Sequence, residues 1–204
     1  MFISGVDEDV ATGDVAEYYA GQRAAWGFLP NYAPAFSTRP DVAAAWNALN
    51  LAVRGGMDRR RFEIATIAAA RARRSTYCTA AHSAFLRDVC ADEATMKAIA
   101  EHPDGAALSE QDRAVYAFAT KVAADASSVG QDDVDALRAS GLDDADVADV
   151  VFAASARLFF TAVLDGLGAE LDEQTAGTFA PALLRSMVVG RPAAVSPGSD
   201  GSAG

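Results

Sequence analysis

The chain has 204 residues, of which 51% are hydrophobic and 22% charged, a composition that is ordinary for a soluble globular protein. Its net charge of −11 argues against a nucleic-acid backbone or an anionic membrane surface as the main partner. Two cysteines cannot build a disulfide framework, and the N-terminal residues lack the basic and apolar segments of a signal peptide. The longest apolar stretch, residues 147–164, is interrupted by Asp149 and Arg157. We therefore expect a cytoplasmic protein without a membrane-spanning helix.

Abundant alanine, together with the scarcity of alternating runs of β-branched residues, favours an all-α fold. In the N-terminal half, the amphipathic repeats predict helices over residues 14–26, 40–56, 59–72 and 76–91. Pro40 is tolerated in a first helical turn, and Asp58 and Ser75 are good N-cap residues for the last two of these helices. An apolar turn around Pro30 separates the first helix from the second.

The C-terminal half contains several further helix signals. Asp92 and Ser109 are expected to cap helices that reach about residues 99 and 122, with a break at residues 103–105 between them. Further helices are expected over residues 131–140, 143–166 and 174–188, which gives seven to nine helices in total. We expect one domain over residues 1–190, followed by a disordered tail over residues 191–204 that is rich in Pro, Gly, Ser and Ala.

The candidate chemistry lies in the stretch from residue 63 to residue 82. Cys78 and His82 are four residues apart, so a helix places them on one face one turn apart. A thiol beside an imidazole can be a nucleophile, because histidine accepts the thiol proton or stabilises the thiolate. If Ser75 is the N-cap, Cys78 is the third helical residue, near the positive end of the helix dipole, and we expect a lowered thiol pKa. Glu63, on the preceding helix, shares a face with apolar residues and is expected to point inward.

Each of these residues also has a purely structural explanation. Cys78 would be a small core hydrophobe, His82 a buried histidine with its hydrogen bonds satisfied, and Glu63 a partner for a nearby arginine. Ser75 would be only the helix cap, although its hydroxyl could donate a hydrogen bond to the thiolate. Tyr77 would be a packing residue, although its phenol could donate a hydrogen bond to a bound substrate.

Two charged groups of residues leave alternatives open. Six arginines lie close together, and we favour solvated helix faces and subunit-contact ion pairs over a local positive potential that activates the thiol; they are Arg59, Arg60, Arg61, Arg71, Arg73 and Arg74. Cys78, His82 and Glu63 lack a fourth ligand and make a weak zinc site, so we expect neither a metal nor a cofactor.

The pattern E-x14-C-x3-H across two helices of an alanine-rich chain resembles the alkylhydroperoxidase D-like and carboxymuconolactone decarboxylase superfamily, in particular its peroxidase-related subgroup. The similarity spans roughly residues 10–175. Further stretches agree with that subgroup, and they are Gly27-Phe28-Leu29-Pro30-Asn31, Arg39-Pro40, Tyr77-Cys78, Leu108-Ser109-Glu110, Leu137-Arg138-Ala139-Ser140-Gly141-Leu142 and Gly166-Leu167-Gly168.

The resemblance implies a site in which a glutamate, a C-x-x-C pair and a histidine relay protons and reduce peroxides. Glu63 matches the glutamate, Cys78 the second cysteine and His82 the histidine, while Ser75 stands at the position of the first cysteine. Serine cannot form the disulfide that ends the two-cysteine cycle. Cys90 would lie about 18 Å from Cys78 along one continuous helix, which is too far for a disulfide. Peroxide reduction would then convert Cys78 to a sulfenic acid and require an external thiol.

Three hypotheses follow. The first is a cysteine-dependent hydroperoxide reductase that acts on a small hydroperoxide with the external thiol as partner. The second is a lyase or isomerase like the decarboxylase branch, in which His82 and Glu63 act as acid and base and Cys78 is dispensable. The third is a non-catalytic helical oligomer or binding module that has lost the redox cycle. The resemblance implies a homo-oligomer in each case.

Overall fold

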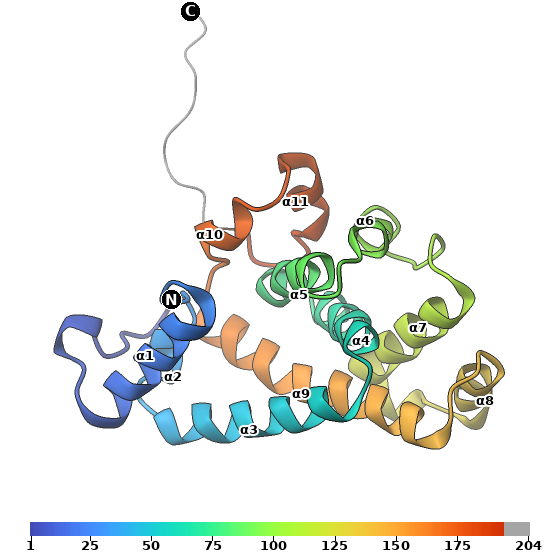
Figure 1. Cartoon of the computed structure of the whole chain (residues 1–204), viewed down its shortest axis with the longest axis horizontal. Helices are drawn as coiled ribbons and strands as arrows, with labels where there is room; N and C mark the ends of the chain where they lie inside the picture. The colour runs from blue at the N-terminus through green and yellow to red at the C-terminus, as the bar shows by residue number, and fades with distance from the viewer. Residues whose placement is uncertain (194–204) are drawn as a thin grey trace, which may run out of the picture.

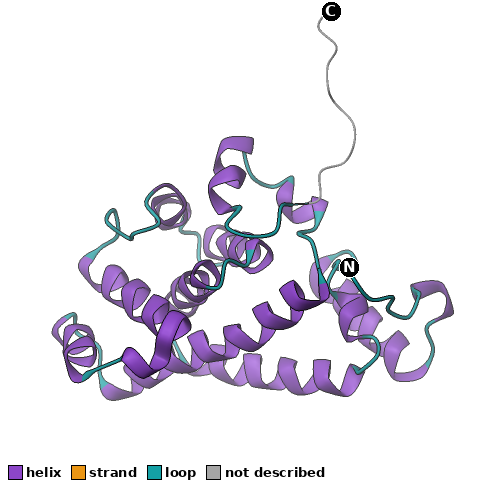
Figure 2. Ribbon diagram, turned by 180° about the vertical axis from the view of Figure 1, so that it is seen from behind, coloured by secondary structure: helices purple, strands orange, loops and turns teal. Residues whose placement is uncertain are grey.

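The computed structural model describes residues 1–193. Every regular element in this part of the chain is helical (Figure 1, Figure 2), which confirms the predicted all-α fold. The helices are α1 Gly13–Trp26, α2 Ala33–Phe36, α3 Pro40–Gly56, α4 Arg59–Ala72, α5 Thr76–Asp88, α6 Glu93–Glu101, α7 Glu110–Asp125, α8 Gln131–Ala139, α9 Asp144–Leu167, α10 Glu173–Ala176 and α11 Pro181–Met187, with 3₁₀ turns η1 Glu8–Val10 and η2 Ala126–Ser128.

Short polar side chains begin four of these helices at the predicted positions. The side chains of Asp58, Asp92, Ser109 and Asp143 each accept a hydrogen bond from the backbone N–H three residues further on, at the starts of α4, α6, α7 and α9. Such a bond satisfies one of the N–H groups that have no partner within the helix. The chain therefore encodes these helix starts locally.

The structure departs from the predicted elements at three places. The short α2 was not predicted, and the helix predicted over 174–188 is split into α10 and α11, because the extended residue before Pro181 interrupts it. Helix α5 ends at Asp88 rather than near Ala91, which has a φ of 53°. Of the predicted tail, residue 191 is attached, since Arg191 donates to the Asp165 carbonyl at 3.0 Å; residues 194–204 lie outside the described residues.

Helix α4 lies at the centre of the fold and packs against α3, α5, α7 and α9 (Figure 1). Nine consecutive residues, from Phe62 to Ala70, are buried. A helix that is buried on all sides needs small residues to let its neighbours approach, and alanines supply four of these nine positions. Glu63 belongs to this buried segment, so its carboxylate is held inside the protein.

Helix α9 is the longest helix in the described residues, and by length and composition alone it could cross a membrane. Here it packs against α3, α4, α7 and α8 as a core helix. Arg157 lies in its middle and is only 4% exposed. The charge that interrupts this apolar stretch therefore faces the protein interior.

The arginine cluster agrees only in part with the favoured expectation of solvated helix faces, since Arg73 and Arg74 are exposed. The expected contacts between subunits stay a prediction. Three of its members form ion pairs inside the chain, which connect α4 to other helices or to itself. The pairs are Arg59–Glu63 at 2.6 Å, Arg60–Asp92 at 2.5 Å, Arg60–Asp112 at 2.6 Å, and Arg61–Asp146. These arginines stabilise the fold around α4.

Arg60 gives a test of this role, because its guanidinium joins Asp92 of the α6 cap to Asp112 of α7. Replacing Arg60 with Met leaves both carboxylates without their cation, so we expect the free energy of unfolding to fall by about 1–2 kcal/mol in urea denaturation. The matched control is Arg138→Met, which removes an exposed ion pair with Asp144 and should change stability little. An equal loss in the two variants would contradict the structural role of Arg60.

Candidate active site

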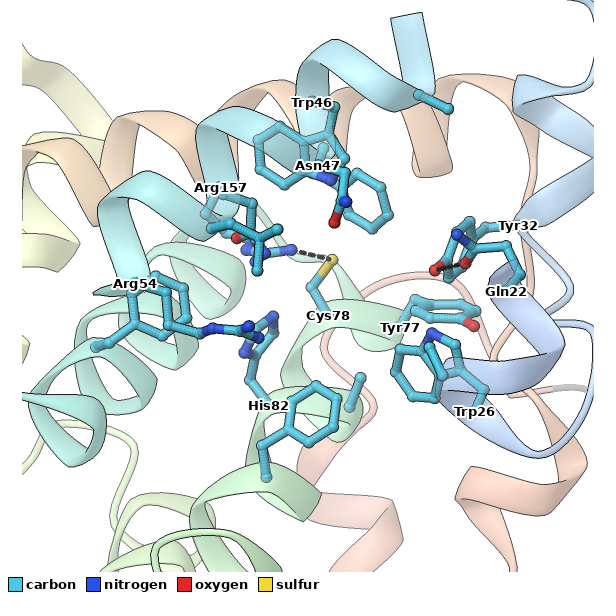
Figure 3. Close-up of a pocket in the computed structure, with 18 of the residues that line it drawn as sticks. Gln22, Trp26, Tyr32, Trp46, Asn47, Arg54, Tyr77, Cys78, His82 and Arg157 are labelled. Carbon is cyan, nitrogen blue, oxygen red and sulfur yellow. Dashed lines mark hydrogen bonds between the residues drawn. The ribbon is translucent and has the colours of Figure 1, made fainter. Parts of the chain in front are cut away.

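A cavity of about 460 Å³ lies between α1, α3, α4, α5 and α9 (Figure 3). Its walls are mainly aromatic, with charged and nucleophilic groups on one side. The aromatic residues are Tyr18, Trp26, Tyr32, Phe36, Trp46, Phe62, Tyr77, Phe85 and Phe160, and the reactive or charged residues are Arg54, Arg59, Glu63, Cys78, His82 and Arg157. Enclosed apolar cavities with a few polar groups are typical of small-molecule sites.

The turn between α4 and α5 positions the thiol. Ser75 occupies the N-cap position, as predicted, and Cys78 is therefore the third residue of α5. The Ser75 hydroxyl, however, accepts no N–H from the helix and is buried without a hydrogen-bond partner. Thr76 closes the turn instead, because its hydroxyl accepts the backbone N–H groups of Val189 at 3.2 Å and Gly190 at 3.1 Å. The C-terminal segment thus holds the first turn of the helix that carries Cys78.

Cys78 is 1% exposed and has one side-chain hydrogen bond, from Arg157 Nη1 to its Sγ at 3.8 Å. The two groups point toward each other in Figure 3. Burial raises the pKa of the Cys78 thiol, although the Arg157 guanidinium acts to lower it. The expectation of a lowered thiol pKa at the helix start was therefore wrong, because removal from water outweighs the nearby positive charge.

Glu63 and His82 form a buried hydrogen-bonded pair, with His82 Nδ1 at 2.5 Å from Glu63 Oε2. Arg59 Nε donates to the other carboxylate oxygen at 2.6 Å. Burial opposes ionisation of Glu63, but His82 and Arg59 hold the pKa of its carboxyl below the ordinary value. Burial and the Arg157 guanidinium lower the pKa of His82 to about 4, against the effect of Glu63. His82 is therefore neutral at pH 7, and the carboxylate fixes its remaining proton on Nδ1, which leaves Nε2 as a base.

The arrangement supports the predicted grouping of Glu63, Cys78 and His82 at one site, with one difference. Cys78 and His82 both line the cavity, but within the described residues no hydrogen bond joins them. Among these residues there is also no group of three or more His, Cys, Asp or Glu placed to hold a metal ion. The hydrogen-bonded pair of Glu63 and His82 and the thiol of Cys78 therefore lie beside each other on one wall of the cavity without a direct hydrogen bond between them.

The phenol hydroxyl of Tyr77 is engaged in a structural hydrogen bond and is not free to bind a substrate. Its hydroxyl donates to Asp172, whose other carboxylate oxygen accepts the Asn31 N–H at 2.6 Å. Burial and the nearby Asp172 raise the pKa of Tyr77, so the phenol stays protonated. The ring still lines the cavity, but its hydroxyl connects α5 to the residues around Asn31 and Asp172.

Arg157 is the site residue that sequence reasoning missed. In the sequence, its charge only interrupts the apolar stretch that forms α9. A usable signal existed, because position 157 is three or four residues from Ala153, Ala154 and Thr161, which form the buried stripe of the helix. A charge on a buried stripe indicates a functional or paired group.

A family model matches the part of the chain that carries the candidate site. Residues 40–121, which contain Glu63, Cys78 and His82, match the model of the carboxymuconolactone decarboxylase family. No curated protein matches the chain in sequence.

Several solved structures share the fold. The alkylhydroperoxidase AhpD core of a peroxidase-related protein from Ralstonia eutropha JMP134 has a TM-score of 0.76 and 23% identity, covering 85% of this chain and 93% of its own. A peroxidase-related protein from Silicibacter sp. TM1040 has a TM-score of 0.72 and 18% identity, covering 84% and 93%. A variant of the debrominase Bmp8, in complex with 2,3,4-tribromopyrrole, has a TM-score of 0.73 and 15% identity, covering 92% and 97%. At these identities the likeness concerns the fold alone.

The lowered pKa of His82 predicts a pH dependence of stability. As pH falls from about 6.5 to 4, the unfolded chain binds a proton at His82 that the folded chain does not, so the free energy of unfolding should fall by about 2–4 kcal/mol. Urea denaturation over this range measures the change. His82→Gln removes the group while leaving the other titrating carboxyls, and its stability should depend less on pH. Identical pH dependence in the two proteins would contradict a neutral, buried His82.

Proposed function

Because the chain belongs to the alkylhydroperoxidase D-like and carboxymuconolactone decarboxylase superfamily, we propose that it is an enzyme of this type, a cysteine-dependent hydroperoxide reductase. The observation that carries the proposal is the cavity wall itself, where a buried thiol touches a guanidinium beside a neutral imidazole oriented by a carboxylate. A nucleophile, a base and an orienting group are the parts that thiol catalysis needs.

In the first step, the Cys78 thiol loses its proton to Nε2 of His82, and the thiolate attacks the outer oxygen of a hydroperoxide ROOH. The S–O bond forms as the O–O bond breaks, which gives the sulfenic acid Cys78–SOH and the alkoxide RO⁻. His82 returns the proton to the alkoxide, so the alcohol ROH leaves. Glu63 accepts the Nδ1–H hydrogen bond throughout and stabilises the transient imidazolium.

Regeneration needs an external thiol, because Ser75 cannot form a disulfide and Cys90 lies beyond the end of α5. A first thiol R′SH reacts with the sulfenic acid to give a mixed disulfide and water. A second R′SH attacks that disulfide, restores the Cys78 thiol and releases the disulfide R′SSR′. Two electrons from two thiols thereby reduce one hydroperoxide.

A second candidate is a lyase or isomerase that uses His82 and Glu63 for acid–base chemistry. The observation that favours it is that these two residues form a complete, correctly protonated pair without any hydrogen bond to the thiol. In that case Nε2 of His82 takes the proton, and Cys78 only lines the cavity. The two candidates differ in whether activity needs the sulfur atom.

We also propose that the chain forms a homo-oligomer. Four large apolar side chains are exposed on the neighbouring helices α3 and α9, namely Leu49 and Leu51 on α3 and Phe152 and Phe159 on α9. Such a surface is suited to contact between subunits. The cytoplasmic location and the third hypothesis, a non-catalytic oligomer, stay predictions.

Peroxide consumption with a dithiol reductant tests the proposed function. We expect Cys78→Ser to abolish turnover and His82→Ala to reduce it by about 10²-fold, because that variant lacks the general base. A dimedone adduct should form at Cys78 after stoichiometric peroxide. Cys90→Ser is the matched control and should retain both turnover and the adduct.

The same variants separate the alternatives. Turnover of a substrate that survives Cys78→Ser but not His82→Ala would replace the reductase by the acid–base enzyme. An unreactive Cys78, with no adduct and no turnover, would contradict both the reductase and its mechanism.

A further inference from the structure

Arg157 is a buried cation that the mechanism above does not use. It is 4% exposed, and within the described residues its guanidinium has no ion pair with a carboxylate. Its Nε is buried without a hydrogen-bond partner. The rings of Trp46 and Phe160 lie 5.6 and 5.4 Å from the guanidinium carbon, which offsets part of the lost hydration.

The nearest carboxylate of the site is already engaged. Glu63 accepts hydrogen bonds from both Arg59 and His82, so its charge is matched by other groups. A buried charge without a counter-ion is costly. Among residues 1–193, the one side-chain atom that Arg157 contacts by a hydrogen bond is Cys78 Sγ, which acquires a negative charge when the thiol ionises.

We propose that Arg157 is a catalytic residue, the counter-ion that holds Cys78 as a thiolate in its reactive state. The inference rests on the proposed thiol chemistry. It adds to that chemistry the positive charge that allows the thiol to ionise although it is buried away from bulk water. His82 then moves the proton, while Arg157 balances the charge that the proton leaves behind.

The other groups around the thiol do not supply this charge. The polar groups around Cys78 are Arg157 and Asp165 of α9, Ser75, Tyr77 and His82 at α5, Glu63 and Arg59 of α4, and Tyr32 before α2. Glu63 and Asp165 are acidic, Arg59 is paired with Glu63, and His82 is neutral. Two other arginines line the cavity, Arg59, which is paired with Glu63, and Arg54 of α3, and neither is hydrogen-bonded to the sulfur in the described part of the chain. Without Arg157, the sulfur would lose the cation that contacts it, so ionisation would become harder.

Alkylation of Cys78 by iodoacetamide, a neutral reagent, tests the proposal in the Cys90→Ser protein. Below the thiol pKa the rate follows the thiolate fraction, so one unit of pKa changes the rate at a fixed pH about tenfold. We expect Arg157→Met to slow alkylation at pH 8 by at least about tenfold, since an opposite charge at this distance shifts a pKa by about 1–3 units. Arg157→Lys should keep most of the parent rate. Arg61→Met removes a cation between α4 and α9 outside the cavity and should match the parent.

Whether the alkylation rate falls or rises in the Arg157→Met protein distinguishes a role of Arg157 as a counter-ion from a role in packing. If Arg157 were only a packing residue, its loss would open the cavity and speed alkylation. A folded Arg157→Met protein that reacts as fast as the parent or faster would therefore overturn the inference and leave the proposed function intact. Should the Met variant fail to fold, Arg157→Gln replaces it, and Gln reacting as fast as Lys would overturn the inference. A parent thiol that does not react at any pH would overturn both proposals.

Discussion

The burial of one carboxylate inside the central helix determines the layout of the site. Glu63 belongs to the segment of α4 that is surrounded by other helices, where an ionised carboxyl is stable only with partners. Arg59 supplies one partner from the same helix, and His82 supplies the other from α5. This second bond fixes the angle of the imidazole, and because Cys78 lies one turn before His82, it also fixes where the thiol meets the cavity.

Burial also affects His82 and Cys78, because it favours the neutral form of both side chains, which makes the imidazole a base and the thiol less reactive. It keeps the imidazole neutral at pH 7, so that Nε2 is available as a base. It also disfavours the thiolate, which makes the resting cysteine a protected thiol rather than an open nucleophile. A buried thiol therefore needs a fixed positive charge beside the sulfur, and the guanidinium of Arg157 on α9 occupies that position.

The local sequence was enough to predict the helices that carry Glu63, Cys78 and His82, because a helix cap and the spacing of apolar residues depend only on residues close together in the chain. The spacing of these three residues, together with the family resemblance, pointed to one site. What could not be predicted depends on contacts between distant segments. Arg157 lies 79 positions from Cys78, and only the packed helices show that it meets the thiol and that burial raises the pKa of that thiol in spite of the guanidinium.

The bonds from Val189 and Gly190 to Thr76 have a consequence for how the protein is made. During synthesis the cysteine leaves the ribosome about 110 residues before the segment that closes over the start of its helix, as the sequence separations of 113 and 114 require. Until that segment emerges, a nascent chain carries the thiol on a helix whose first turn is not yet held by these bonds. The final position of the cysteine is thus secured only after a segment more than a hundred residues further along the chain has been made.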